Sequence, residues 1–316
     1  MGRQTRILAE GLYFGEGPRW RDGRLWFSDF HAHAVKSVSL AGDVRTEVEL
    51  NDQPSALGVH HHVVTVAGGD PGEVGVHRQR AVAAADQQLA PDHRHDQQGA
   101  VRHPAQARGL VVQLHFRPHV AGHCNDMVVD AQGRAYVGNF GFDFGARIAA
   151  HGMQGAMVDA PTAKLALVLP DGEVRAAAEG LHFPNGSVIT PDGSTLIVAE
   201  TLASCLTAFD IGPDGDLSNR RVWAPTPGAP DGIALDAAGA IWVASPGGQG
   251  CVRIAEGGEV LEAIDPGQAC YACILGGDDG RTLFMLTAPP MGENPAAAPL
   301  GKVSVATVDV PHAGLP

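Results

Sequence analysis

The stretch that decides the fold spans residues 182–200 and consists of His182-Phe183-Pro184-Asn185-Gly186-Ser187-Val188-Ile189-Thr190-Pro191-Asp192-Gly193-Ser194-Thr195-Leu196-Ile197-Val198-Ala199-Glu200. A short apolar run, a Pro-Asp-Gly turn and a β-branched run follow one another, and this order predicts a β-hairpin. The pattern recurs over residues 231–244, with a shorter second arm. In both copies a polar residue stands eight places before the turn glycine: Asn185 before Gly193, and Asp231 before Gly239.

The same offset identifies further copies of the pattern. Asn125 stands eight places before Gly133, and Glu16 stands seven before Gly23. Weaker copies occur over residues 54–58 and at Ala272, before Gly280. The copies recur at irregular intervals of about forty to seventy residues, and each is a strand pair without helical periodicity. Six such units predict an all-β fold, a six-bladed β-propeller in which each unit is one four-stranded blade.

The two ends of the chain are predicted to share one blade. Residues 5–12 are expected to form an extended strand, and residues 302–310 alternate apolar and polar side chains as a half-buried strand does. A propeller has to join its first and last blades, and pairing the terminal strands would remove an exposed sheet edge. We therefore expect one domain over residues 1–316, closed by its own termini.

Composition excludes several classes of function. A net charge of −13 argues against a nucleic-acid partner but is compatible with a bound cation. No apolar run has the length of a signal peptide core or a membrane span, so no membrane partner and a cytoplasmic location are expected. The five cysteines lack a framework spacing, which favours reduced thiols, and the lone pair Cys270 and Cys273 is expected to be buried in a strand.

One segment departs from the pattern. Residues 59–122 contain nine of the fifteen histidines and two Asp-Gln-Gln units, at 86–88 and 96–98, and residues 63–67 provide the only good strand signal. The second blade is therefore expected to be irregular. A transition-metal tract formed by His60-His61-His62 with His93 and His95 is the least favoured interpretation. A loose insertion and a segment translated out of frame remain open alternatives.

Four motifs in order resemble those of the SMP-30/gluconolactonase/regucalcin family of six-bladed propellers. They are Gly15-Glu16-Gly17-Pro18, Asn125-Asp126, Phe183-Pro184-Asn185-Gly186 and Pro230-Asp231-Gly232-Ile233-Ala234-Leu235-Asp236. The resemblance covers about residues 8–58 and 123–290. It implies one divalent cation, commonly Ca²⁺, at the mouth of the central channel, and hydrolysis of a sugar-type lactone.

The repeat pattern leads to the same metal site. Equivalent residues of successive blades lie on a ring around the propeller axis, so Glu16, Asn125, Asn185 and Asp231 are expected to converge. Two carboxylates and two amide oxygens suit a hard cation, Ca²⁺ first, with Mg²⁺, Mn²⁺ or Zn²⁺ as alternatives. Four protein ligands leave room for water and a small-molecule lactone. The competing interpretation of Asn185 and Asp231 is that they are turn residues beside glycines.

The resemblance implies further substrate-binding residues. Family members often carry an arginine two places before the Asn-Asp pair, and His123 occupies that place here. A shorter imidazole predicts a different lactone, or weaker binding of a polyhydroxylated one. Asn125 is expected to bind substrate as well as metal. Asp126 is expected to orient the Asn125 amide, and Asp143 to reach the rim from the next loop.

The predicted reaction is metal-assisted hydrolysis of an ester, with Asp231 as the candidate general base as well as a ligand. The sequence has no G-x-S-x-G elbow and no phosphate-binding Gly-Lys loop, so serine-hydrolase and nucleotide-dependent chemistry have no motif support. Two alternatives stay open. One is phosphotriester hydrolysis on the same scaffold, and the other is a non-catalytic calcium-binding propeller.

Overall fold

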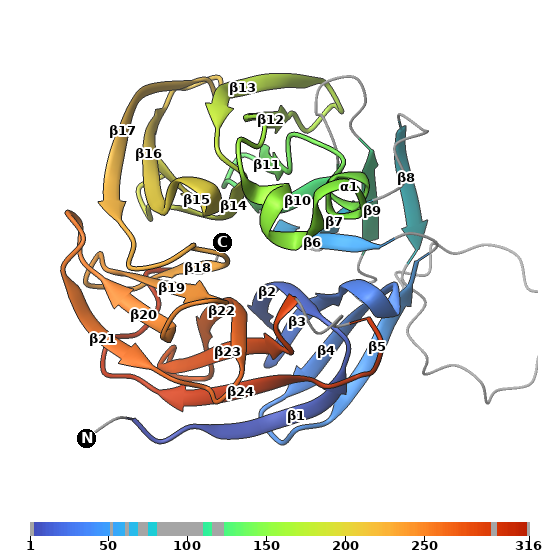
Figure 1. Cartoon of the computed structure of the whole chain (residues 1–316), viewed down its shortest axis with the longest axis vertical. Coiled ribbons are helices and arrows are strands. Elements are labelled where there is room, and N and C mark those ends of the chain that lie inside the picture. The colour runs from blue at the N-terminus through green and yellow to red at the C-terminus, as the bar shows by residue number, and fades with distance from the viewer. Residues whose placement is uncertain are drawn as a thin grey trace, which may run out of the picture.

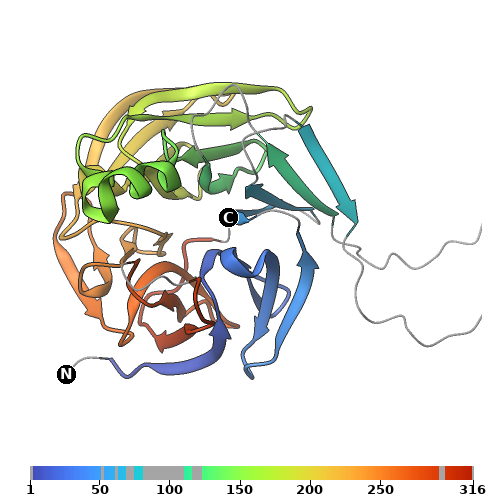
Figure 2. The ribbon, with the colours of Figure 1, turned by 45° about the vertical axis from the view of Figure 1, so that its right-hand side comes forward.

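The computed structural model describes residues 3–50, 53–60, 63–68, 75–80, 110–115, 123–291 and 296–314. Its strands form four-stranded sheets arranged around a central axis (Figure 1). Turned by 45°, the same sheets still surround that axis (Figure 2). The predicted all-β propeller architecture is therefore confirmed.

Five of the sheets are blades in which consecutive strands pair antiparallel. The first contains β2 (Gly15–Arg21), β3 (Arg24–Asp29), β4 (Ala34–Ser39) and β5 (Val44–Glu49). The next contains β10 (Cys124–Val129), β11 (Ala135–Asn139), β12 (Ala163–Val168) and β13 (Val174–Leu181). The third contains β14 (Pro184–Ile189), β15 (Thr195–Glu200), β16 (Cys205–Ile211) and β17 (Leu217–Pro225). The fourth contains β18 (Ile233–Leu235), β19 (Ile241–Ser245), β20 (Gly250–Ile254) and β21 (Val260–Ile264).

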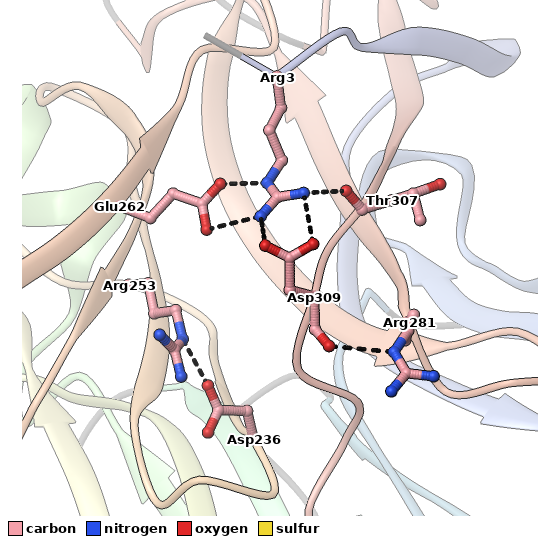
Figure 3. Close-up of polar contacts among 7 residues, drawn as sticks. All are labelled: Arg3, Asp236, Arg253, Glu262, Arg281, Thr307 and Asp309. Carbon is pink, nitrogen blue, oxygen red and sulfur yellow. Dashed lines mark hydrogen bonds and ion pairs between the residues drawn. The ribbon is translucent and has the colours of Figure 1, made fainter. Parts of the chain in front are cut away.

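The fifth blade closes the ring and confirms the predicted pairing of the two ends of the chain. It contains β22 (Ala269–Gly276), β23 (Thr282–Ala288), β24 (Gly301–Thr307) and β1 (Arg6–Leu12). Strand β1 pairs antiparallel with β24, so the outermost strand comes from the N-terminus. Arg3 adds polar contacts to this closure (Figure 3). Its guanidinium pairs with Glu262 of the neighbouring blade, and donates to Asp309 Oδ2 at 2.7 Å and Thr307 O at 3.0 Å.

The prediction of six blades is wrong, because only five sheets in the described part of the chain have this topology. The remaining sheet has the order β6 (Pro54–His60), β7 (Val63–Gly68), β9 (Leu110–His115) and β8 (Gly75–Arg80). Strands β7 and β9 are parallel, whereas a blade pairs each strand antiparallel with the next. Parallel neighbours need a crossover rather than a tight turn, and the strand pair that begins at Pro54 lacks the turn glycine that the other blades carry seven or eight places after the repeat position.

The atypical segment also contains more strand than its sequence suggests, since β8 and β9 accompany the expected strand over 63–67. Most of the proposed histidine tract, His61, His62, His93 and His95, lies outside the described residues. The Asp-Gln-Gln units lie outside them too. A helix, α1 (Phe144–Met157), was not expected either. Two short 3₁₀ turns, Phe30–Ala32 and Thr201–Ala203, complete the elements in the described part of the chain.

Apolar side chains fill the space between neighbouring blades. Trp20 of β2 stacks on Phe284 of β23 with ring centroids 5.2 Å apart, which joins the first blade to the closing one. Around the axis the inner strands approach so closely that glycine is required. A Cβ on Gly186 would lie 2.6 Å from the Asp231 carbonyl oxygen, and one on Gly232 would lie 2.7 Å from the Ala272 Cα. Side chains at these places would force the blades apart.

None of the helices in the described residues combines the length and apolar character that crossing a bilayer requires.

Candidate metal and carboxylate site

Strands β2, β6, β10, β14, β18 and β22 are nearest the axis in their sheets (Figure 1). Their first residues form one end of the ring, here named the start rim, and the turns that follow them form the turn rim. Each long inner strand shifts register just after its first residues: between Glu16 and Arg19, Pro54 and Ala56, Cys124 and Met127, Pro184 and Ser187, and Cys270 and Ala272. Such a bulge turns a side chain out of the regular alternation of a strand.

Three predicted ligands lie side by side on this rim. The amide nitrogen of Gly186 donates to the main-chain oxygen of Asp231 at 3.2 Å, which joins the starts of β14 and β18. The Asn185 side chain hydrogen-bonds the Asp231 carboxylate. Asn125 Nδ2 donates to Pro184 O at 3.1 Å, which joins β10 to β14. Asn125, Asn185 and Asp231 therefore occupy three neighbouring blades on the same side of the ring.

Glu16, the fourth predicted ligand, lies at the start of β2 in the first blade. Burial raises the pKa of its carboxyl well above the ordinary value, and the charges of Asp231 and Asp126 raise it further. The pKa of Asp231 is also raised well above its usual range, by burial and by Asp126, while the hydrogen bond from Asn185 opposes the shift. Asp126 and Asp231 therefore lie near enough to Glu16, and Asp126 near enough to Asp231, for their charges to act, since the repulsion between charges falls with distance.

Asp126 belongs to this carboxylate cluster, although the sequence suggested only that it orients Asn125. It is 5% exposed, and its Oδ1 accepts a hydrogen bond from the Met127 amide at 3.1 Å. Burial raises its pKa, while the positive charge of Arg19 and the Met127 hydrogen bond lower it. The carboxylate cluster is defined here as Glu16, Asp126 and Asp231.

Arg19 was not identified from the sequence. It is 7% exposed and donates to two carbonyl oxygens, Pro18 O at 2.7 Å and Met127 O at 2.5 Å. Burial lowers the pKa of its guanidinium, and Asp126 opposes that effect. The available signal was an arginine within the apolar inner strand of a repeat, between Pro18 and Trp20, where a charged side chain needs a partner.

The other two predicted site residues are more peripheral. The His123 ring is half-buried and packs near Phe140, with centroids 6.4 Å apart. Asp143 is exposed and forms the N-cap of α1, where its Oδ1 accepts from the Ala146 amide at 2.9 Å. Neither shares a hydrogen bond with the carboxylate cluster in the described residues. Their role in binding substrate stays a prediction.

The donor set at the start rim consists of carboxylate and amide oxygens. Asn125 and Asn185 use their amide nitrogens, the latter toward Thr201 Oγ1 at 3.2 Å, which leaves their amide oxygens as acceptors. With the Glu16 and Asp231 carboxylates they form an all-oxygen set, which suits a hard cation. Within the described part of the chain, no group of three or more His, Cys, Asp or Glu side chains forms a metal site unaided. The residues fit the cation only if the two amides contribute.

The cysteines match their predicted state, because all five are free thiols and Cys270 and Cys273 are buried in β22. Cys251 of β20 is hydrogen-bonded to both of them, and burial raises its pKa well above the ordinary value. A protonated, buried thiol is a weak nucleophile and a poor metal ligand, so this cluster is structural.

A cavity of about 860 Å³ lies at the opposite, turn rim. The ends of the inner strands line it together with His312 and Gly314 of the C-terminal segment. Arg19 lines it too, whereas none of the carboxylate cluster does. Arg19 therefore lines the cavity at the turn rim while its charge acts on Asp126 of the carboxylate cluster.

Comparisons with known proteins agree with this fold. A family model described as the SMP-30/gluconolactonase/LRE-like region matches residues 14–289. Similar solved structures include a luciferin-regenerating enzyme, with a TM-score of 0.70 and 18% identity over 98% of this chain and 97% of that one. A gluconolactonase from Xanthomonas campestris has a TM-score of 0.63 and 20% identity, with 99% and 90% of the chains covered. A calcium-binding regucalcin from Agrobacterium tumefaciens has a TM-score of 0.62 and 19% identity, with 99% and 98% covered.

At these identities the solved structures establish the fold alone. The family model, in contrast, covers most of the chain, including the inner strands that carry Glu16, Asn125, Asn185 and Asp231. Its match confirms the resemblance drawn from the four motifs, and it supports a lactonase-type function. The protein is therefore a member of the SMP-30/gluconolactonase/LRE-like family.

Proposed function

We propose that the protein is a metal-dependent hydrolase that opens a sugar-type lactone at the start rim. The observation that carries the proposal is the group of the buried Asp126 with the half-buried Glu16 and Asp231. Burial raises the pKa of all three carboxyls, Asp231 and Asp126 raise that of Glu16 further, and Asp126 raises that of Asp231 further. Burying like charges together is unfavourable unless a cation offsets them, so such a cluster in a fold of this family is best explained by a bound ion.

Glu16, Asn125, Asn185 and Asp231 would hold the cation, Ca²⁺ first among the candidates. When bound, it supplies Lewis-acid polarisation of the lactone carbonyl and stabilises the negative charge that develops on its oxygen. The calcium-binding regucalcin among the similar structures supports the choice of metal.

Side chains of the protein would accept the proton and bind the substrate. Asp231 is the candidate base that accepts a proton from the attacking water, because its raised pKa brings it closer to the working pH. The hydrogen bond from Asn185 fixes the orientation of that carboxylate. His123 and the Asn125 amide oxygen would contact the hydroxyl groups of the substrate, and Asp143 stays a candidate for a more distant contact.

A substrate panel tests this function. Purified protein is treated with EDTA and assayed with glucono-δ-lactone, other sugar lactones and a phosphotriester, before and after addition of Ca²⁺ or Mn²⁺. The expected result is lactone turnover that EDTA abolishes and Ca²⁺ restores. Turnover that survives complete metal removal would overturn the metal dependence. Tight calcium binding without turnover of any lactone would identify a binding protein instead, and preference for the phosphotriester would overturn the substrate assignment.

A further inference from the structure

The cluster at the start rim contains three carboxylates but has one fixed positive charge close by. The charges of Asp126 and Asp231 act on Glu16, that of Asp126 acts on Asp231, and that of Arg19 acts on Asp126. Arg19 forms no ion pair in the described residues, and its two hydrogen bonds are to main-chain carbonyls. Its charge is therefore available to the cluster rather than neutralised by a partner of its own.

Hydrogen bonds to one residue of β10 hold Arg19 near Asp126. Its Nη2 donates to the carbonyl oxygen of Met127, and the amide of the same residue donates to Asp126 Oδ1. Arg19 and Asp126 thus bind the two polar groups of one residue in β10. Because both side chains are less than a tenth exposed, water screens their interaction poorly.

The net charge of the site favours a divalent cation over a trivalent one. Three ionised carboxylates and one guanidinium carry two net negative charges, which one divalent cation neutralises. Without the guanidinium the same site would carry three, and would suit a trivalent ion. A buried site that stays neutral when occupied avoids the large cost of an uncompensated charge.

We propose that Arg19 is a specificity-determining residue that matches the start rim to a divalent cation, by offsetting the charge of Asp126 from the turn-rim side. This inference rests on the proposed function, because it assumes that the cation is held by the predicted ligands. It assigns Arg19 no contact with the metal or the substrate.

The charge preference is measured by calorimetric titration of metal-free protein with Ca²⁺ and, separately, with La³⁺. In Arg19→Met, which keeps the length of the side chain but removes the charge, the La³⁺ to Ca²⁺ affinity ratio is expected to rise on the order of tenfold or more. Arg21→Met is the matched control. Arg21 is two residues further along β2 and pairs with the exposed Asp22, so its loss is expected to leave the ratio unchanged.

Two more variants guard against a folding defect in Arg19→Met. Asp126→Asn removes one negative charge and is expected to lower the La³⁺ to Ca²⁺ ratio. The double variant Arg19→Met/Asp126→Asn restores two net negative charges and is expected to return to the wild-type ratio. Equal ratios in wild type, Arg19→Met and Asp126→Asn would overturn the role of Arg19. Failure of the wild type to bind Ca²⁺ at all would overturn the proposed metal site instead.

Discussion

The side chain of Asn185 hydrogen-bonds the carboxylate of Asp231, so two residues identified by the same offset in the repeat meet across neighbouring blades. The main-chain bond from Gly186 to Asp231 fixes the same pair of strand starts. A turn residue would bond only within its own loop, whereas the Asn185 side chain bonds both Thr201 of its own blade and Asp231 of the next. The contact favours a shared role at the rim.

Replacing Asp231 with Asn is expected to lower kcat for the lactone by about 10²–10⁴, the usual contribution of a general base, and to weaken Ca²⁺ binding. The amide keeps the shape of the side chain but can neither accept the water's proton nor carry negative charge. Steady-state kinetics and calorimetry measure the two effects. Asp22→Asn is the control, because Asp22 is an exposed turn residue with φ of 50°, a conformation that Asn tolerates. Activity of Asp231→Asn within tenfold of wild type would remove Asp231 from the mechanism.

Metal-free protein is expected to lose stability as the pH rises. Folding raises the pKa values of Glu16, Asp126 and Asp231, mainly through burial, above ordinary values of about 4. The folded state then binds more protons than the unfolded state. The stabilisation that these three carboxyl groups contribute is therefore fully present below about pH 4, and it is lost as the pH rises through their folded pKa values. Ca²⁺ should reverse the decline, because it replaces the protons as the counter-charge.

Thermal melts from pH 5 to 8, in EDTA and in Ca²⁺, measure this effect. The window starts at pH 5 because exposed carboxyls such as Asp210, whose pKa is lowered by Asn219 and Arg221, titrate below it. Glu16→Gln is the matched variant and should flatten the EDTA profile. A melting temperature in EDTA that rises across this window would contradict the assignment of the carboxylate cluster.

The repeat offset predicted which residues lie at the start rim, because equivalent positions of successive blades lie next to one another around the propeller axis. The offset identified four residues as equivalent strand-start positions before any strand boundary was known: Glu16, Asn125, Asn185 and Asp231. Arg19 and the membership of Asp126 in the cluster could not be predicted in this way. Each depends on a bulge that changes which side chains face the axis, and a bulge leaves no mark in an offset measured to the turn.

The sequence predicted that one sheet would be irregular but did not predict how its strands pair. The histidine-rich composition and the weak strand signal over 59–122 predicted that the second blade would be irregular. Pairing of β7 with β9 across a long connection depends on contacts far apart in the chain. Periodicity of two residues identifies a strand but not its neighbour. Asp143 illustrates the same limit at a single residue, since the sequence indicated a loop but not the helix that follows it.

Gly186→Ala is expected to destabilise the protein by about 1–3 kcal/mol and to weaken Ca²⁺ binding. The new Cβ would lie 2.6 Å from the Asp231 carbonyl oxygen, so β14 and β18 would have to separate. Gly247→Ala is the control, because a Cβ there meets nothing within 4 Å and the backbone needs no positive φ. Denaturant unfolding and calorimetry compare the two. Equal stability of both variants would show that the close approach of the inner strands is not required.

Asp143 allows a test that separates its observed contact from its predicted one. Asp143→Ala removes the N-cap of α1 and is expected to cost about 1 kcal/mol, whereas Asp143→Asn keeps a capping oxygen and should leave stability unchanged. Because the side chain is exposed and bonded to its own helix, kcat/KM for the lactone is expected to stay within about threefold of wild type in Asp143→Asn. Thermal melts and steady-state kinetics give both readouts. A KM raised tenfold or more in Asp143→Asn, with stability intact, would show that the carboxylate contacts the substrate after all.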